Sequence, residues 1–228
     1  MAYYSEKSLD KKIDVFKNKT QIRRIEFDNQ NFTDDNIWDV VSYSGTGGSY
    51  DFVLIPSSSI YKIIDNIRLV QPVTNSNIRF GGRDDDIRFG DFFKTVLETR
   101  YIRSQSGLQI VFGANSATGN NKFENDQIVF YCNETPNNWF ARCSSGGTTT
   151  QVDTGITIAN DTAYKLKIVA DTISALFYIN DILVATINNN IPASEILKHR
   201  LFSIRTGAGT HYSYLDYIDY RFIYNNIR

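Results

Sequence analysis

Short apolar runs separated by polar turn residues follow one another along the chain from residue 22 to residue 224. Runs rich in Ile, Val, Tyr, Phe and Thr are typical of β-strands, and clusters such as SGTGGS, FGGRDDD and TGAGT end them. The expected strands span residues 22–27, 37–43, 50–55, 67–70, 97–103, 108–112, 127–133, 139–143, 155–158, 163–170, 173–179, 182–187, 201–206 and 213–224. Only IPASEILKH, residues 191–199, and part of SSSIYKIIDNI predict short helices. The pattern therefore predicts an all-β sandwich or barrel.

The stretch ALFYINDILVATI, residues 175–187, predicts a β-hairpin. Asn180 and Asp181 tolerate positive φ, so they can form a two-residue type I′ turn. An uninterrupted ladder from this turn would place Phe177 opposite Val184. Since both faces of the hairpin are apolar, we expect it to be covered on both sides and to lie away from a sheet edge.

The net charge of the chain argues against two classes of binding partner. The 228 residues carry a net charge of -1, which argues against a nucleic-acid partner and against a polybasic membrane binder. No apolar run reaches the ~18 residues of a membrane-spanning helix, so we expect no membrane insertion. The opening MAYYSEKSLDKKIDVFKNK lacks the apolar core of a signal peptide, so we expect synthesis and assembly in a cytoplasm.

Residues 1–24 differ from the rest because Lys and Arg outnumber Asp and Glu. A short helix here would show Leu9, Ile13 and Phe16 on one side, but a helix of this length is not stable alone in water. We interpret the segment as an N-terminal arm with these three residues as partner-docking candidates, and a frayed terminus is the alternative. Residues 25–228 are predicted to form a single domain.

Two cysteines flank a predicted loop in FYCNETPNNWFARC. With the loop centred on residues 137–138, Cys132 and Cys143 would lie opposite each other on paired strands. A cross-strand disulfide is one reading, and a reduced, buried pair is the favoured one.

Several longer motifs succeed one another between residues 97 and 224. ETRYIRSQSGLQIVFG and QIVFYCNETPNNWFARCSSGGTTTQVDTGI precede TAYKLKIVADTISALFYINDILVATI and NNNIPASEILKHRLFSIRTGAGTHYSYLDYIDYRFIY. Their order resembles concanavalin A-like jelly-roll domains in tail, fibre and head-decoration proteins of tailed bacteriophages. In that group a Tyr-x-Leu-x-Ile strand leads to a Phe-Tyr-Ile-Asn hairpin, Ile-Pro and a closing Asp-Tyr strand. The resemblance covers a little over half of the chain and implies a two-sheet antiparallel jelly-roll sandwich, with residues 25–96 supplying its opening strands.

Enzymes with this fold are expected to be glycoside hydrolases or lyases. The glucanase version carries Glu-x-Asp-x-Glu on one strand, which aligns two carboxylates on one face, and that spacing is absent here. Glu98 and Glu124 lack suitable acidic neighbours, and strand parity predicts that Asp216 and Asp219 point to opposite faces. We therefore predict no catalytic residues and no enzymatic activity.

Metal and cofactor sites find little support in the sequence. Asp84, Asp85 and Asp86 could offer oxygens to Ca²⁺, yet their spacing is not that of a calcium loop, so a solvated acidic turn is favoured. His199 and His211 have no partners at zinc-ligand spacing. No phosphate loop and no Gly-x-Ser-x-Gly motif is present, so we predict no metal and no cofactor.

Carbohydrate binding has a clearer basis, because sugar sites combine aromatic faces with amide and carboxylate groups near loop tips. The candidates are Asn137, Asn138, Trp139, Tyr212 and Tyr214. The alternative is that the aromatic residues belong to the core, since Trp139 has the strand parity of a core residue.

The resemblance leads to one functional hypothesis with two alternatives. It predicts a non-enzymatic structural protein of a bacteriophage virion, exposed on tail or capsid and assembled in the host cytoplasm. Its expected partners are other virion proteins, further copies of itself, with a trimer favoured, and a host-surface polysaccharide. A free-standing lectin-like module and a glycoside hydrolase or lyase are the alternatives.

Overall fold

The computed structural model describes residues 20–26, 42–44, 49–53, 66–71, 77–81, 87–88, 92–116, 123–133, 137–193, 196–205 and 211–224. Every regular element in these ranges is a β-strand, and they contain no helix of the length and hydropathy needed to cross a membrane. The strands are β1 (Thr20–Glu26), β2 (Ser42–Ser44), β3 (Ser49–Val53), β4 (Asn66–Gln71), β5 (Asn77–Gly81), β6 (Ile87–Arg88), β7 (Phe92–Arg103), β8 (Leu108–Asn115), β9 (Gln127–Cys132), β10 (Asn138–Ser145), β11 (Thr148–Thr157), β12 (Thr162–Ala170), β13 (Ala175–Ile179), β14 (Ile182–Ile187), β15 (Ile196–Arg205) and β16 (His211–Tyr224).

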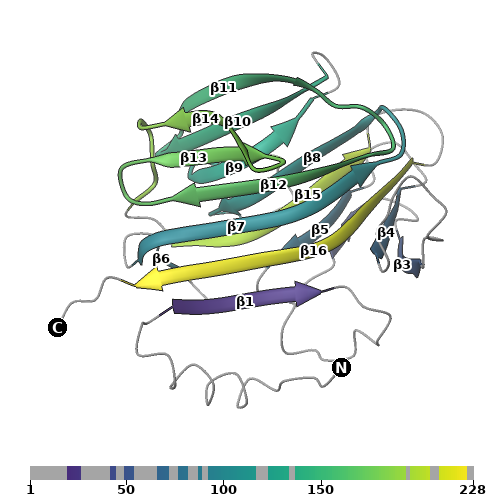
Figure 1. The fold of residues 1–228 in the computed structure, drawn as a ribbon, viewed down its shortest axis with the longest axis horizontal. Coiled ribbons are helices and arrows are strands. Elements are labelled where there is room, and N and C mark those ends of the chain that lie inside the picture. Colours follow the sequence, from purple (N-terminus) through teal and green to yellow (C-terminus); the bar gives the residue numbers. More distant parts are fainter. Residues whose placement is uncertain are drawn as a thin grey trace.

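The strands form two antiparallel sheets that pack face to face (Figure 1). Sheet A has the order β14-β13-β12-β7-β16-β4-β3, with β1 paired to β16. Sheet B has the order β11-β10-β9-β8-β15-β5-β2, with β6 paired to β15. This architecture confirms the predicted all-β, two-sheet jelly-roll sandwich.

The last two described strands each lie in the middle of one sheet, β16 in sheet A and β15 in sheet B. β16 pairs with β7 on one side and with β4 and β1 on the other, and β15 pairs with β8 and β5. Figure 1 shows β1 in purple beside the yellow β16. β1 begins at Thr20, so residues 20–24 of the predicted arm are part of sheet A. The docking candidates Leu9, Ile13 and Phe16 lie outside the described residues.

Aromatic rings from both sheets meet in the core between them. Trp139 of β10 makes edge-to-face contacts with Tyr101 of β7 and Tyr164 of β12. Phe130 of β9 contacts Phe177 of β13 in the same way, with ring centroids 5.0 Å apart. Such contacts between alternate residues of facing strands explain why the period-two pattern produces a sandwich.

The hairpin turn has the predicted geometry, but its ladder differs. Asn180 and Asp181 have φ angles of 51° and 65°, as a type I′ turn requires. The register then shifts, so that Phe177 pairs with Ala185 and Val184 is an extra residue. The predicted pairing of Phe177 with Val184 is therefore wrong, because a β-bulge separates the turn from the rest of the ladder.

The position of the hairpin in the sheet also differs from the prediction. β14 is the terminal strand of sheet A in the described part of the chain. Ile182 and Leu183 are 68% and 50% exposed. The expectation that the hairpin lies away from an edge is therefore wrong. Within the described chain only the face bearing Phe177 is covered, by sheet B, and cover of the other face by a partner stays a prediction.

The two cysteines are buried and free, but they do not lie opposite each other. β9 and β10 pair Cys132 with Trp139 and Cys143 with Ile128. An offset of several residues along a strand exceeds the short Cα distance that a disulfide spans. Cys132 Sγ instead accepts a hydrogen bond from the amide of Ile110 over 3.3 Å.

The predicted helix at residues 191–199 is wrong over its second half, where β15 begins at Ile196. β15 pairs with β8 from Lys198 to Arg205, and Leu197 is buried in the core. Helix propensity is a weak preference, and pairing in the middle of a sheet overrides it.

Candidate functional site

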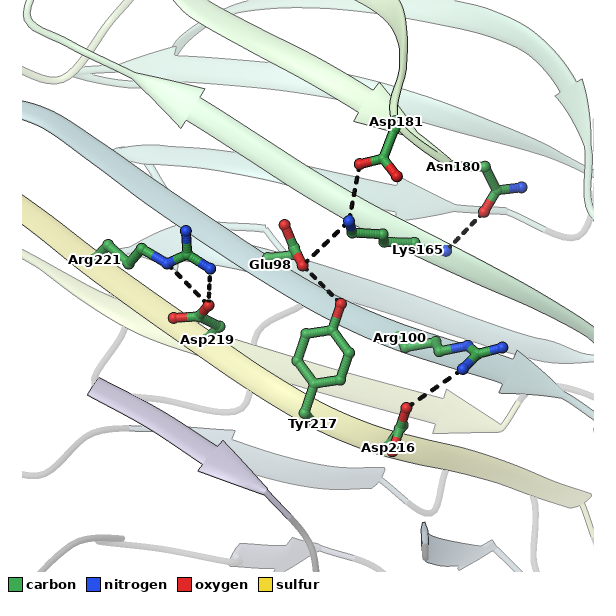
Figure 2. Close-up of polar contacts among 9 residues, drawn as sticks. All are labelled: Glu98, Arg100, Lys165, Asn180, Asp181, Asp216, Tyr217, Asp219 and Arg221. Carbon is green, nitrogen blue, oxygen red and sulfur yellow. Dashed lines mark hydrogen bonds and ion pairs between the residues drawn. The ribbon is translucent and has the colours of Figure 1, made fainter. Parts of the chain in front are cut away.

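Sheet A places a group of ionisable side chains on the face turned away from sheet B, which we call the outer face of sheet A. β7 sends Leu97 into the core, so its neighbour Glu98 lies on the outer face. β12 sends Leu166 into the core, so Lys165 lies on the outer face as well. Asp219 of β16 is the register partner of Glu98. Figure 2 shows the resulting group, the Glu98 cluster, which comprises Glu98, Arg100, Lys165, Asp181, Asp216, Tyr217, Asp219 and Arg221.

Glu98 is the central carboxylate of this cluster and is largely buried. Tyr217 donates a hydrogen bond from its hydroxyl to Glu98 Oε1 over 2.7 Å. Lys165 Nζ lies 3.5 Å from the same oxygen (Figure 2). A hydroxyl donor and a cation from two neighbouring strands thus hold one carboxylate in place.

Lys165 joins this carboxylate to the tip of the β13–β14 hairpin. Its Nζ lies 2.8 Å from Asp181 Oδ1, and its backbone amide donates to Asn180 Oδ1 over 2.9 Å. The hydrogen bond to Asp181 raises the pKa of Lys165, and the same bond lowers the pKa of Asp181. The turn residues therefore fix the hairpin tip as well as closing it.

A β-bulge in β16 shapes the lower part of the cluster. The register with β7 shifts between Leu215 and Ile218, so two residues of β16 stand opposite one residue of β7. Thr99 Oγ1 donates to the backbone carbonyl of Tyr217 over 2.7 Å and anchors the bulge. Because of the extra residue, both Asp216 and Tyr217 reach the outer face (Figure 2).

The prediction that Asp216 and Asp219 point to opposite faces is wrong for this reason. Asp216 Oδ2 lies 3.6 Å from Arg100 Nη1, and Asp219 Oδ2 accepts a hydrogen bond from Arg221 Nε over 3.0 Å. An alternating strand separates residues at odd spacing, but one inserted residue brings them to the same side. All the acidic side chains of β7 and β16 therefore share the outer face of sheet A.

The outer face of sheet B, turned away from sheet A, is filled by the protein's own side chains. A buried apolar cluster there contains Val111, Val129, Tyr131 and Phe140. The rings of Tyr131 and Phe140 stack with centroids 5.0 Å apart, and Phe123 packs edge-on against Tyr131 at 4.8 Å. The guanidinium of Arg142 lies 4.1 Å from the centroid of the Phe123 ring. Phe123 thus folds back from the β8–β9 connection onto the sheet.

Sheet B also lacks the carboxylates for acid–base chemistry. Among its described strands only β11 contains an acidic residue, Asp153. Asp153 accepts hydrogen bonds from Asn138 Nδ2 at 3.1 Å and from the amide of Gly155 at 2.8 Å. A catalytic pair of strand carboxylates would therefore have to come from sheet A.

The structure separates the predicted sugar-binding residues into two groups. Trp139 is fully buried in the core, so its prediction as a stacking surface is wrong, and its strand parity is the physical reason. Asn137 Nδ2 donates to the carbonyl of Ile158 over 2.8 Å, which ties it to the β11–β12 connection. Asn138 is bound to Asp153 at the edge of sheet B. These three residues form no common surface with the Glu98 cluster.

Tyr212 and Tyr214 form the second group. They alternate along β16 with the buried residues Ser213 and Leu215, so they lie on the outer face of sheet A. Both are partly exposed. The structure therefore brings these two predicted residues onto the same face as the Glu98 cluster.

Sequence reasoning missed the role of Arg103, whose side chain is almost completely buried. Its guanidinium donates to Asn160 Oδ1 over 3.1 Å, to Asn137 Oδ1 over 2.8 Å and to the carbonyl of Ile158 over 2.9 Å. Arg103 follows Leu97 and Tyr101 at even spacing along β7, so the alternation of the strand predicts that its side chain points toward the core. Phe123 lies outside any strand, and nothing in the local pattern marks it.

Metal binding has no support in the described part of the chain. No three His, Cys, Asp or Glu side chains gather there at a distance at which they could share a metal ion. His211 is buried in β16, and His199 has Ala114 as its register partner. Asp84, Asp85 and Asp86 lie outside the described residues.

Comparison with known proteins identifies the fold of the chain but assigns it to no family. No family model matches the chain, and no curated protein sequence matches it. A protein of unknown function from Shewanella oneidensis is 13% identical, with 100% of this chain and 98% of that chain covered and a TM-score of 0.62. The β-glucanase of Bacillus licheniformis is 11% identical, with 90% and 98% covered and a TM-score of 0.57. The endo-β-1,4-glucuronan lyase of the fungus Trichoderma reesei is 13% identical, with 80% and 90% covered and a TM-score of 0.54.

The fold is a concanavalin A-like jelly roll. Identities this low establish the arrangement of the strands and leave the chemistry to the side chains. Two of these three similar structures are named as enzymes that act on polysaccharides, which makes the distribution of carboxylates on this chain the informative comparison.

Proposed function

We propose that this protein is a non-enzymatic, glycan-binding jelly-roll protein that forms part of a bacteriophage particle. The observation that carries the proposal is the state of the carboxylates on the outer face of sheet A. Glu98 is held by Lys165 and Tyr217, and the two aspartates of β16 are each held by an arginine. Glycoside hydrolysis needs one carboxyl group as a proton donor and a second, about 5–10 Å away, as nucleophile or base. Carboxylates occupied by cations support a binding surface and not this acid–base pair.

The glycan-binding part of the proposal rests on the types of side chain on the outer face of sheet A. It combines partly exposed tyrosines with arginine, lysine and carboxylate groups, the set of side chains that contacts sugar rings and hydroxyl groups. The names of similar structures, a β-glucanase and a glucuronan lyase, add that this fold is used by proteins that act on polysaccharides.

The assignment to a virion rests on the sequence resemblance to phage tail, fibre and decoration proteins. The motifs behind it fall on strands of both sheets, and one part of them, the Tyr-x-Leu-x-Ile strand and the hairpin after it, forms the adjacent strands β12, β13 and β14 of sheet A. Tyr164, Leu166 and Ile168 of β12 belong to the core. The proposed partners are accordingly other virion proteins, further copies of this chain in a trimer, and a polysaccharide of the host surface.

The test of catalysis uses the purified full chain and polysaccharides isolated from bacterial surfaces. We expect binding without release of new reducing ends or of unsaturated sugars. Glu98→Gln and Asp219→Asn serve as matched variants, since they remove charge and keep shape. Cleavage by the unaltered chain that either variant abolishes would show a hydrolase or lyase and overturn the non-enzymatic proposal.

The test of context is purification of phage particles that encode the chain, followed by mass spectrometry of the particle proteins. We expect the chain at a fixed stoichiometry relative to the other virion proteins. A chain that binds polysaccharide but is absent from intact particles would be a free-standing lectin-like module.

A further inference from the structure

We propose that the glycan binds across the outer face of sheet A, over Tyr212, Tyr214 and the Glu98 cluster, and that it is an uncharged polysaccharide with neighbouring hydroxyl groups. This inference rests on the proposed glycan-binding function and specifies its location and ligand class. It excludes the outer face of sheet B, which is the other broad sheet surface of the sandwich.

The aromatic rings on the described part of the outer face of sheet B contact the protein's own side chains, and the partly exposed Phe123 ring lies 4.1 Å from the Arg142 guanidinium. Tyr131 and Phe140 stack on each other and are buried, and Phe123 covers the edge of Tyr131. The hydroxyl of Tyr131 donates to Gln151 Oε1 over 2.9 Å. A sugar could reach these rings only after Phe123 had left its place between Tyr131 and Arg142.

The outer face of sheet A, in contrast, places partly exposed tyrosines beside exposed polar groups. Tyr212 and Tyr214 lead along β16 directly to the bulge that presents Asp216 and Tyr217. Arg100, opposite the bulge, has 35% of its side chain exposed, and its partner Asp216 has 27% exposed. A saccharide lying along β16 would therefore meet ring surfaces at one end and hydrogen-bonding groups at the other.

The pairing of charges indicates an uncharged ligand. Each carboxylate of the cluster has a cationic partner, as in Arg100–Asp216 and Lys165–Asp181. Lys165 serves both Glu98 and Asp181, so the cluster has three cations, Arg100, Lys165 and Arg221, for four carboxylates. A cluster without an excess of positive charge has little long-range attraction for a polyanion. A carboxylate next to a guanidinium can, however, accept from one sugar hydroxyl while the guanidinium donates to the neighbouring one.

One atom of the cluster lacks a hydrogen-bond donor. Asp219 is 2% exposed, and within the part of the chain that the structure describes its Oδ1 has no hydrogen-bond partner, although Oδ2 is bound to Arg221. A buried carboxylate oxygen without a donor is unfavourable. A hydroxyl group of a bound sugar that reached this oxygen, beside Glu98, would supply the donor.

The experiment begins with a glycan array that carries neutral and acidic polysaccharides, probed with the full chain. The strongest ligand is then titrated by calorimetry against variants of both faces. Tyr214→Ala and Arg100→Met alter the outer face of sheet A, while Gln151→Ala and Arg142→Met are matched controls on sheet B. Circular dichroism verifies that each variant is folded.

We expect Tyr214→Ala and Arg100→Met each to weaken binding about tenfold or more, the effect of losing one good contact, and the sheet B controls to change it less than about twofold. Tyr214→Phe should retain most of the affinity because it keeps the ring. The affinity should also change little between low and high salt, as expected for an uncharged ligand.

The outcomes separate this inference from the proposed function. Loss of binding in the sheet B controls alone would place the glycan elsewhere and overturn the inference, while glycan binding itself would stand. A strongest ligand that is acidic and bound in a salt-dependent way would overturn the ligand class. Absence of binding to every polysaccharide on the array would contradict the proposed function itself.

Discussion

Asn137 Oδ1 accepts a hydrogen bond of 2.8 Å from Arg103 Nη1, and Asn137 Nδ2 donates to the carbonyl oxygen that Arg103 Nη2 also contacts, that of Ile158. Both the oxygen and the nitrogen of the Asn137 side-chain amide therefore form hydrogen bonds within the protein. The three acceptors of this buried guanidinium described above are neutral oxygens from the β9–β10 and β11–β12 connections. Arg103 therefore joins two connections that are distant in the sequence.

Replacing Arg103 by leucine should lower the free energy of unfolding by about 3–5 kcal/mol, since it leaves several buried acceptors without donors. Arg100→Leu on the same strand is the control, because Arg100 forms only a partly exposed ion pair worth about 1 kcal/mol or less. Urea denaturation followed by tryptophan fluorescence measures both. Equal effects of the two substitutions would show that the Arg103 hydrogen bonds contribute little.

The type I′ turn can be tested at Asn180, which has a φ of 51° and accepts a hydrogen bond from the amide of Lys165. Asn180→Ala should destabilise the protein by about 1–2 kcal/mol more than Asn180→Gly, because alanine resists positive φ and glycine does not. Both variants lose the same hydrogen bond, so their difference isolates the backbone conformation. Indistinguishable unfolding midpoints would contradict the turn geometry.

The two faces of the hairpin should respond differently to truncation. Phe177→Ala removes a buried ring and should cost about 3–5 kcal/mol of unfolding free energy. Leu183→Ala, on the exposed side of the same hairpin, should cost less than about 1 kcal/mol. Thermal and urea unfolding of the pair measure the difference, and a comparable loss for Leu183→Ala would mean that this side is covered.

The thiols should be unreactive in the folded protein. Both cysteines are buried, and burial raises the pKa of Cys143 far above its usual range, so little nucleophilic thiolate is present near neutral pH. Iodoacetamide at pH 8 should label neither cysteine in the native state and both in denaturant without a reducing agent. Incomplete labelling in denaturant that a reducing agent restores would reveal a disulfide.

The contact between Lys165 and Asp181 should make a small, pH-dependent contribution to stability. The hydrogen bond lowers the pKa of Asp181, so its contribution is complete above the unfolded-state pKa of about 4 and is lost as the pH falls below it. The raised pKa of Lys165 means that the contribution is also lost at strongly alkaline pH, above about 10.4. A double-mutant cycle with Lys165→Met and Asp181→Asn should show coupling at pH 7 and none at pH 2.5. Coupling that persists at pH 2.5 would exclude this ion pair as its source.

The features that could be predicted from the sequence are those determined by neighbouring residues. The Asn180–Asp181 turn and the alternation of core residues along β12 depend on local conformational preference and on strand period. The order of the motifs along the chain supported the resemblance to jelly-roll domains, which implied the two-sheet sandwich. The fold class was therefore accessible before the structure.

The errors arise where a single inserted residue or an offset between strands changes the geometry. The bulges at Val184 and at Asp216–Tyr217 reverse the parity of every residue beyond them, and no local signal marks either one. Cys132 and Cys143 were misplaced because β9 and β10 pair with an offset that the turn residues alone do not determine. The Glu98 cluster escaped prediction for the same reason, since the bulge in β16 assembles it.

The central position of β15 and β16 also determines when the sandwich can close during synthesis. β2 to β5 leave the ribosome before β15 and β16, yet among the described strands they connect to β7 and β8 only through these two later strands. Until β16 has emerged, the exposed edges of β4, β5, β7 and β8 have no partners, and exposed edges invite pairing between chains. Closure of the sandwich therefore depends on contacts between distant parts of the chain, which form slowly, and the unfinished sandwich is the state most prone to pairing between chains.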